Sequence, residues 1–451
     1  MAGIPPEYGR DTVAPTVLAG GQPATGSWTS AAAVLAPYPD WSRVCLGVWV
    51  VRVLVSGASV AGPVLAYWLH RYGFEVTVVE QAPALRHAGG HAVDLFRPAL
   101  EIIDRMGLAE QVAAAATGTD RITLYREGVA TPVHIDLTRL LAAVSDRHVE
   151  IMRDDLSTIL HSSTAATVEY LFGDSITAIG QGGEVSFARA RPRVFDVVIG
   201  ADGLHSNVRR LVFGPETRFA THLGAYVAVA SVPNDLGLRG EMIVDAGVGR
   251  MAGLYGARRT GDGRAVFLFR TEAPLAYHHR DVPRQKQLLR AAFAGAGARV
   301  EALLAELNTT PAFYFDSITQ LHLDTWSRGR VSLVGDAGYC PGPAVGGSTS
   351  LAVVGAYVLA GELAEAGGDP ARAFPAYEAA IGDYVRGSRA FARATAKSIV
   401  PVNRLVLWAI ANGARLASHT PPALARALGR LNRRGLRLHD SIAVRDYQRR
   451  S

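Results

Sequence analysis

The sequence predicts an α/β fold in which a parallel sheet covered by helices is interrupted by an inserted antiparallel sheet. Three observations support this. Apolar, β-branched runs alternate with helix-length segments from Val51 to about residue 215. From about 216 to 325, short strand-like runs follow one another closely, as in an antiparallel sheet. A buried strand pattern and a long apolar helix pattern return after residue 326, so the first domain is discontinuous in the sequence.

Composition narrows the function classes. A chain of 451 residues with 49% hydrophobic and 19% charged residues is long and apolar enough for two or three domains, or one large domain with a subdomain. The formal charge is +6, but the sequence contains no recognisable nucleic-acid-binding motif, so we expect no nucleic-acid partner. Cys45 and Cys340 lack the spacing of metal ligands, so no metal site is expected. Without a secretory signal or an apolar run of about 20 residues, we expect a cytoplasmic protein that does not enter membranes.

Residues 1–48 are rich in small residues and proline and lack periodicity, which predicts a flexible N-terminal tail. The tail is either a true appendage or the product of an upstream start codon. We expect the fold to begin near Val51.

The stretch VLVSGASVAG, from Val53 to Gly62, has the pattern of a strand, a glycine turn and a helix. Gly57 permits the tight turn, and Gly62 permits close packing of the helix on the strand, which leaves helix N–H groups to face a pyrophosphate. Ser59 stands where the best-known turn has its middle glycine, which weakens the signal. Glu80 ends the next strand at about the 20-residue spacing of a ribose-binding carboxylate. The set favours a Rossmann-like nucleotide site over an ordinary turn, but does not distinguish NAD from FAD.

Two later motifs also follow buried strand patterns. Asp202 and Gly203 end the run FDVVIGADG, and Asp336 follows RVSLVG before a glycine-rich loop. With the first turn, and with Arg153 in VEIMRDDL, these motifs resemble the fingerprints of the flavin monooxygenases of the p-hydroxybenzoate hydroxylase fold. The match runs in order from Val53 to near Tyr447. The branch it resembles contains tetracycline-inactivating and natural-product tailoring monooxygenases.

This resemblance implies FAD as the cofactor and NADPH or NADH as the electron donor. It implies that Arg153 contacts the flavin, that Asp336 accepts from a ribityl hydroxyl, and that the helix after the glycine-rich loop points at the flavin. The residues expected to bind FAD are Gly57, Ser59, Val60, Ala61, Gly62, Glu80, Gln81, Gly90, Asp94, Arg153, Asp202, Gly203, Asp336, Pro343, Gly346, Gly347 and Ser348. Arg86 is expected to contact the nicotinamide donor.

The resemblance also implies a domain division. The FAD-binding domain would comprise residues 51–120, 138–215 and 326–395, the substrate domain residues 121–137 and 216–325, and a C-terminal helical segment residues 396–451. A substrate pocket is expected between the inserted sheet and the flavin. Its candidate lining residues are Tyr226, Met242, Met251, Tyr255 and Phe267, each of which is equally a candidate for the core of that sheet.

The implied activity is that of an FAD-dependent monooxygenase. It would use NAD(P)H and O₂, through a flavin C4a-hydroperoxide, to hydroxylate a hydrophobic aromatic or polyketide-like small molecule, as a monomer or homodimer. Because the cofactor carries the chemistry, no catalytic side chain is assigned.

Baeyer–Villiger oxidation, a flavin halogenase or reductase, and a flavin-binding protein with little turnover remain alternatives. None of the six tryptophans forms the Trp-x-Trp-x-Ile-Pro signature of the halogenases. A dehydrogenase with a Tyr-x-x-x-Lys pair is excluded, because the lysines are Lys286 and Lys397.

Overall fold

The structure, a computed structural model, describes most of the chain from Val50 onward. The described residues are 50–85, 90–138, 145, 147–258, 260–310, 312–343, 347–419 and 440–447. The predicted tail, Arg86, Gly346 and most of the helix predicted at 139–146 lie outside these ranges.

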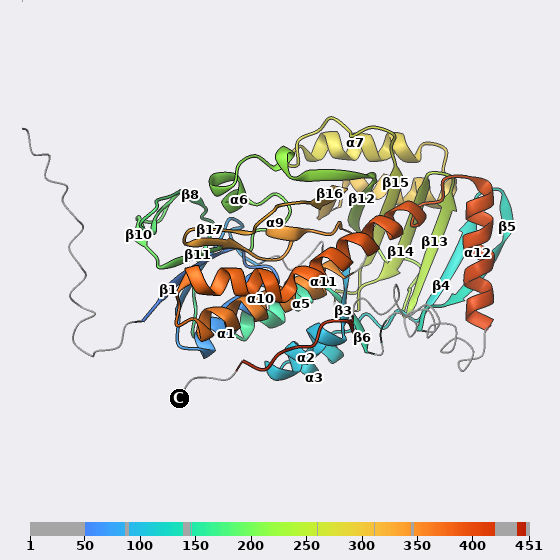
Figure 1. Ribbon diagram of the computed structural model, residues 1–451. Helices are drawn as coiled ribbons and strands as arrows, with labels where there is room; N and C mark the ends of the chain where they lie inside the picture. The colour runs from blue at the N-terminus through green and yellow to red at the C-terminus, as the bar shows by residue number, and fades with distance from the viewer. Residues whose placement is uncertain are drawn as a thin grey trace, which may run out of the picture. The chain divides into compact units, whose positions relative to one another are not determined.

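A parallel sheet forms the first part of the fold (Figure 1). Its strands, in spatial order, are β17 (Ser327–Arg328), β18 (Val331–Leu333), β11 (Val197–Gly200), β1 (Arg52–Ser56), β2 (Glu75–Glu80) and β7 (Glu169–Phe172). All neighbours pair in parallel except β17, which is antiparallel to β18. The strands are short apolar runs because both faces of the sheet are covered.

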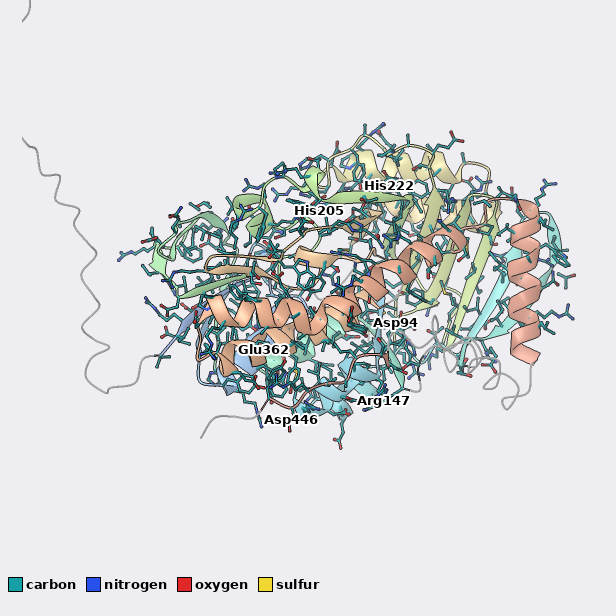
Figure 2. All side chains as sticks on the ribbon, in the orientation of Figure 1. Asp94, Arg147, His205, His222, Glu362 and Asp446 are labelled. Atoms are coloured by element: carbon teal, nitrogen blue, oxygen red, sulfur yellow. The ribbon has the colours of Figure 1, made fainter. Side chains whose placement is uncertain are left out.

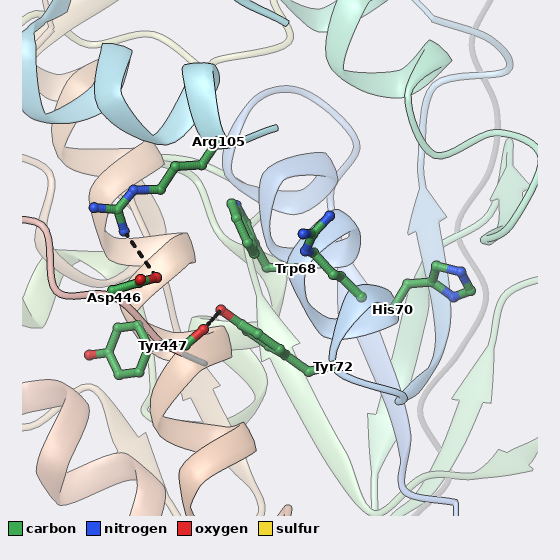
Figure 3. A pocket seen from close by; sticks show the side chains of 7 residues that line it. Trp68, His70, Tyr72, Arg105, Asp446 and Tyr447 are labelled. Atoms are coloured by element: carbon green, nitrogen blue, oxygen red, sulfur yellow. Dashed lines mark hydrogen bonds and ion pairs between the residues drawn. The ribbon is translucent and has the colours of Figure 1, made fainter. Parts of the chain in front are cut away.

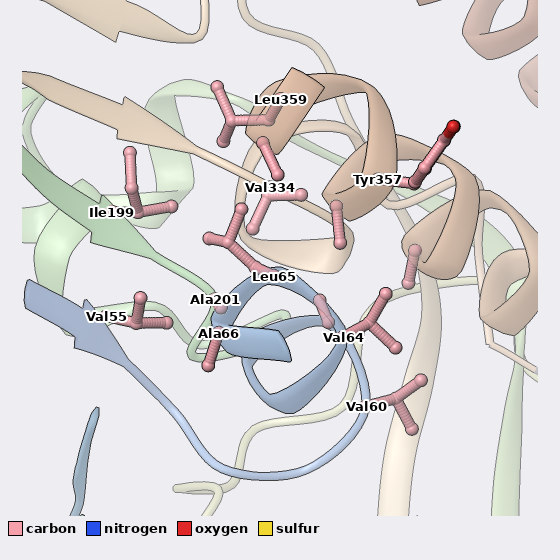
Figure 4. Close-up of a cluster of buried hydrophobic side chains, with 14 of the residues drawn as sticks. Val55, Val60, Val64, Leu65, Ala66, Ile199, Ala201, Val334, Tyr357 and Leu359 are labelled. Atoms are coloured by element: carbon pink, nitrogen blue, oxygen red, sulfur yellow. The ribbon is translucent and has the colours of Figure 1, made fainter. Parts of the chain in front are cut away.

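Helices α1 (Ala61–Arg71) and α10 (Ser348–Glu365) pack together beside this sheet. Side chains around most of the circumference of α10 are buried, because α1, α2 (Arg97–Arg105) and α11 (Pro370–Ser398) all contact it. Figure 4 shows Leu65 of α1 together with Leu359 of α10 and with Val334, just after β18. This core fixes the strand ends that carry the predicted motifs.

A second sheet of seven strands follows the order β16 (Phe313–Leu321), β12 (Ala220–Val232), β15 (Gly263–Arg270), β14 (Arg250–Gly256), β13 (Glu241–Gly247), β4 (Arg121–Arg126) and β5 (Val129–Asp136). Its pairs are antiparallel except β13 with β4, which is parallel. The strands β4 and β5 come from residues 121–137, which the sequence assigned to the inserted part. One face packs on α7 (Val282–Phe293) and α8 (Ala298–Ala305) through a core that includes Phe269 and Phe315.

Two smaller sheets, β3 with β6 and β10-β9-β8, and several short helices complete the fold. The strands β3 (Ala92–Phe96) and β6 (His148–Met152) form an antiparallel pair, followed by α5 (Arg153–Ser162). The remaining described elements are α3 (Ala109–Ala114), β8 (Ile176–Ile179), β9 (Glu184–Phe187), β10 (Arg193–Val194), α6 (Asn207–Val212), α9 (Asp336–Tyr339) and the 3₁₀ turns Glu216–Arg218 and Glu306–Asn308. The strands β3, β6, β8, β9 and β10 were not predicted, because they are short and partly exposed and so lack a clear apolar period.

The long helix α11 contacts α10 at the parallel sheet and β12 in the seven-stranded sheet. It is followed by α12 (Arg404–His419), which packs on β5 and β13 (Figure 1). Residues 441–447 were included in a segment predicted to be helical but are not helical. They lie along α10 instead, where the Tyr447 hydroxyl donates a 2.7 Å hydrogen bond to Glu362. Of the helices that the structure describes, none combines the length and the apolar character needed to cross a bilayer.

Candidate functional site

The glycine turn between β1 and α1 has no room for side chains at its two glycines. Gly57 has a φ of 107°, and a Cβ there would lie 2.5 Å from the Ala201 carbonyl oxygen. A Cβ at Gly62 would overlap the Gly57 carbonyl oxygen. The helix that follows has no side-chain cap at Val60, so its first N–H groups remain available to an anion. This turn therefore fits a pyrophosphate.

Glu80 lies at the end of β2, beside the same turn. One carboxylate oxygen accepts a hydrogen bond of 2.9 Å from the Ala58 N–H, and the other accepts one of 2.8 Å from the Ala82 N–H. These bonds fix the carboxylate beside the turn. Because each oxygen can accept a second hydrogen bond, Glu80 can still bind a ribose hydroxyl. The neighbouring Gln81 is exposed.

Arg153 is the first residue of α5, and Asp336 is the first residue of α9, which follows β18. Burial raises the pKa of Asp336, and the positive charge of Arg153 partly opposes this rise. Burial lowers the pKa of His91 to about 4, an effect that Arg153 reinforces. The Arg153 charge also acts on Tyr314, whose pKa is raised mainly by burial. The structure thus brings a predicted flavin-binding pair together with two residues that the sequence did not single out.

Asp202 lies beside the glycine turn, where the Ser56 hydroxyl donates a 3.3 Å hydrogen bond to its carboxylate. Its carboxylate accepts hydrogen bonds of 2.9 and 3.0 Å from the Asn207 and Val208 N–H groups and is also bonded to Ser206. Burial raises the pKa of Asp202, and the hydrogen bonds from Ser206 and Val208 oppose this rise. The carboxylate therefore caps α6 and shapes the turn. Gly203, with a φ of 77°, has open space where a side chain would point.

Gly90 and Asp94 belong to a segment that is bonded to four other elements, α5, β15, β6 and α10. The Gly90 N–H donates a 2.6 Å hydrogen bond to Asp154 of α5, and its carbonyl accepts one of 3.2 Å from Arg264 of β15. The Asp94 carboxylate is 2.8 Å from His148 Nε2 (Asp94 is labelled in Figure 2). The carbonyl of Asp94 accepts a 3.0 Å hydrogen bond from Ser350 in the first turn of α10. These contacts place β3 between the helices α5 and α10 and the seven-stranded sheet.

The glycine-rich loop leads into α10. Gly347 has a φ of 83° and precedes Ser348, the first residue of the helix. No side chain caps this end of α10, so its N–H groups are available to a ligand. Pro343 is described, whereas Gly346 is not.

The register of the seven-stranded sheet shows which of its residues face the predicted flavin side. Neighbouring pairs put Met242, Tyr255 and Arg264 on one face. On the same face, the next row runs through the residues Tyr314, Val229, Val266, Gly253 and Val244. We call this surface the inner face.

Contacts from the inner face reach the segment before β3 and the loop before α6. The Tyr255 hydroxyl accepts a 2.9 Å hydrogen bond from the Ala92 N–H, and the Tyr314 ring stacks on His91 with centroids 5.7 Å apart. Asp316 lies 3.0 Å from His205 Nε2, in the loop that follows Gly203. With the bond from Arg264 to Gly90, these contacts place the inner face beside the flavin-binding candidates.

The five predicted pocket residues fall on both faces of the sheet. Met242, Met251 and Tyr255 lie on the inner face. Tyr226 and Phe267 lie on the opposite face, 1% and 0% exposed, in the core against α7 and α8. Their side chains are therefore part of that core, as strand alternation requires.

His205 is a residue whose environment the sequence did not reveal. Burial lowers its pKa, but hydrogen bonds and charges of Asp316 and Glu216 outweigh this and raise the pKa to about 10. Figure 2 labels His205 near β16 and α6. The run LHSN after Gly203 contains His205, but no local pattern could indicate its partner Asp316, because Asp316 is 111 residues away.

A separate cavity of about 710 Å³ lies between α1, α2 and the C-terminal residues. Its lining residues are Trp68, His70, Arg71, Tyr72, Arg105, Asp446 and Tyr447 (Figure 3). It contains none of the predicted site residues.

Among the described residues, no group of His, Cys, Asp or Glu side chains is arranged to hold a metal ion.

The fold is of the p-hydroxybenzoate hydroxylase type. On it, three features define a dinucleotide site of the flavoprotein type: the tight glycine turn, the Glu80 carboxylate beside that turn, and the Arg153 side chain among buried groups. Residues 50–380 match the FAD binding domain family. The chain belongs to this family of flavin-dependent monooxygenases.

The chain is similar to two further proteins and to one solved structure. An uncharacterised protein of Mycobacterium tuberculosis is 44% identical over 347 residues, which cover 74% of this chain and 90% of that protein. A flavin-dependent monooxygenase of Legionella longbeachae is 37% identical over 344 residues, covering 76% and 87%. The crystal structure of the tetracycline destructase Tet(55) matches with a TM-score of 0.74 and 31% identity, covering 88% of this chain and 99% of that chain.

Proposed function

We propose that this protein is an NAD(P)H-dependent monooxygenase that transfers one oxygen atom from O₂ to a hydrophobic aromatic or polyketide-like small molecule. The observation that carries the proposal is the position of the inner face. Three contacts join it to residues 90–92, so a molecule bound there would lie beside Arg153 and Asp336. The bound FAD would carry out the chemistry with O₂.

The described residues that would hold FAD divide into three groups. The glycine turn and α1 would bind the pyrophosphate, and Glu80 would accept from the adenosine ribose. Arg153 and Asp336 would contact the flavin half, and the uncapped start of α10 would place partial positive charge at its edge. Asp202 would act by shaping the turn at α6, since its carboxylate is already bonded. Arg86 remains our proposed contact for the nicotinamide donor.

The inner face would bind the substrate. Its half-buried side chains Met242, Met251, Val266 and Tyr314 are largely apolar, which suits a hydrophobic ring system. A similar protein is named a tetracycline destructase, and that name supports a small-molecule substrate for this chain as well. The protein's part in the reaction is to orient the substrate and to exclude water from the flavin.

The proposal is tested by screening phenolic and polyketide ligands for stimulation of NADPH and NADH oxidation by the FAD-loaded protein. Products are analysed by mass spectrometry. We expect a ligand that both accelerates oxidation and gains one oxygen atom. A protein that binds ligands tightly, while oxidation stays unchanged and no ligand gains oxygen, would instead be a flavin-binding protein with little turnover.

A further inference from the structure

Ser59 occupies the position at which a G-x-G-x-x-G turn usually has its middle glycine. Its side chain points to α5, where its hydroxyl accepts a 3.2 Å hydrogen bond from Arg153 Nε and lies 3.4 Å from the Ser157 hydroxyl. The Ser157 hydroxyl also lies 3.0 Å from the Ser59 carbonyl oxygen, to which it donates. Arg153 and Ser157 are four residues apart and share one face of α5. The turn is thus held to α5 at two points.

The bond at Nε leaves the rest of the Arg153 guanidinium available. Within the described part of the chain, neither Nη group of Arg153 has a hydrogen-bond partner. The charge of this side chain acts on Asp336 and Tyr314, so it lies among the residues that would surround the flavin. A guanidinium is planar, with its donors in a fixed arrangement. Fixing Nε therefore helps to orient the two Nη groups.

We propose that Ser59 is a positioning residue, whose hydroxyl holds Arg153 so that both Nη groups are directed at FAD. The inference rests on the proposed function, because it takes FAD as the ligand of Arg153. A free arginine side chain loses conformational entropy when a ligand fixes it. Because the Ser59 hydroxyl already restricts Arg153 in the protein without ligand, less of that entropy is lost on binding.

This role predicts an effect opposite to the one that the turn motif alone predicts. The motif's middle glycine lets the backbone approach the pyrophosphate, so Ser59→Gly should strengthen FAD binding if Ser59 is merely tolerated. If Ser59 positions Arg153, the same substitution should weaken binding, because the hydroxyl is lost.

The test is a titration of apo-protein with FAD, followed by quenching of flavin fluorescence. We expect Ser59→Gly and Ser59→Ala to raise the Kd about tenfold, the factor that corresponds to losing one hydrogen bond to a charged group. Ser59→Thr keeps the hydroxyl and should restore the Kd to within about twofold of the wild type. Unchanged or tighter binding by Ser59→Gly would overturn the proposal.

A double-mutant cycle separates positioning of Arg153 from any other effect of Ser59. In an Arg153→Met background, Ser59→Ala should change the Kd by less than about twofold, since the group through which it acts is absent. A tenfold effect in both backgrounds would overturn the proposal. Melting curves of the apo-proteins establish that each variant is folded. If the wild type binds no FAD, the proposed function fails. If it binds FAD and Ser59→Gly binds equally well, only the role of Ser59 fails.

Discussion

The Tyr255 hydroxyl on β14 accepts a 2.9 Å hydrogen bond from the backbone N–H of Ala92 on β3. This bond is one of three contacts that join the seven-stranded sheet to residues 90–92. Because Tyr255 is buried, with 5% of its surface exposed, water does not readily replace the bond.

Replacing Tyr255 by Phe should therefore destabilise the protein by about 1–2 kcal/mol, the cost of leaving a partly buried N–H group without its partner. The measurement is the free energy of unfolding in urea. The matched control is Tyr67→Phe, because the Tyr67 hydroxyl makes a longer bond, of 3.3 Å, to Met106. A loss of stability no larger in Tyr255→Phe than in Tyr67→Phe would show that the Tyr255 hydroxyl does not stabilise the contact between β14 and β3.

Gly62→Ala should prevent FAD binding, because the added Cβ would overlap the Gly57 carbonyl oxygen and force the turn open. The matched control is Gly413→Ala in α12, where a Cβ meets nothing within 4 Å. That substitution should stabilise the helix by about 1 kcal/mol and leave FAD binding unchanged. Fluorescence titration and melting curves measure both effects. Normal FAD binding by a folded Gly62→Ala protein would contradict the assigned turn.

The elevated pKa of His205 predicts a specific pH dependence. Its value rises from the ordinary 6.5 to about 10, and the charged or titratable groups facing it include Glu216, Asp316 and His279. A raised pKa in the folded state contributes stability that is fully present below pH 6.5 and is lost as the pH rises towards 10. Unfolding free energies should therefore fall across this window in the wild type.

The His205→Gln variant should show a flatter profile over the same pH range, measured by urea unfolding at several pH values. His70→Gln, at an exposed position of α1, serves as the control and should keep the wild-type slope. A slope that His205→Gln leaves unchanged would mean that other groups cause the pH dependence.

The two faces of the seven-stranded sheet should respond differently to substitution. Phe267→Ala should cost about 3–5 kcal/mol in unfolding free energy, because it opens a cavity in the core against α7 and α8. Val266→Phe adds volume to the inner face, and should reduce ligand-stimulated NAD(P)H oxidation while FAD affinity stays within about twofold. Loss of ligand stimulation in a stable Phe267→Ala protein, with Val266→Phe unaffected, would reverse the assignment of the faces.

The sequence predicted those parts of the site that depend on local chemistry. Gly57, Gly62 and Glu80 could be found because a tight turn with close helix packing needs particular residues at particular spacings. Strand alternation could show that Tyr226 and Tyr255 were candidates, but it could not tell which face of the sheet each occupies. That choice depends on register between distant strands.

Long-range contacts are the other limit of sequence-based prediction. Tyr314 and Arg264 join the inner face to residues 90–91 across long sequence separations, so no local pattern marks them. Asp202 shows a related limit. Its motif predicted a turn near the cofactor, but it did not predict that the carboxylate accepts hydrogen bonds from the first N–H groups of α6. Ser59 looked like a weakened motif position until the bond from Arg153 gave it a partner.

The most direct measurement of the central claim is a titration of the purified apo-protein with FAD, monitored by the visible flavin spectrum. We predict saturation at one FAD per chain, a yellow protein, and bleaching of the bound flavin by NADPH or NADH in the absence of oxygen. FAD is added, and unbound FAD is then removed by gel filtration. A folded protein that is colourless after this treatment would contradict the account.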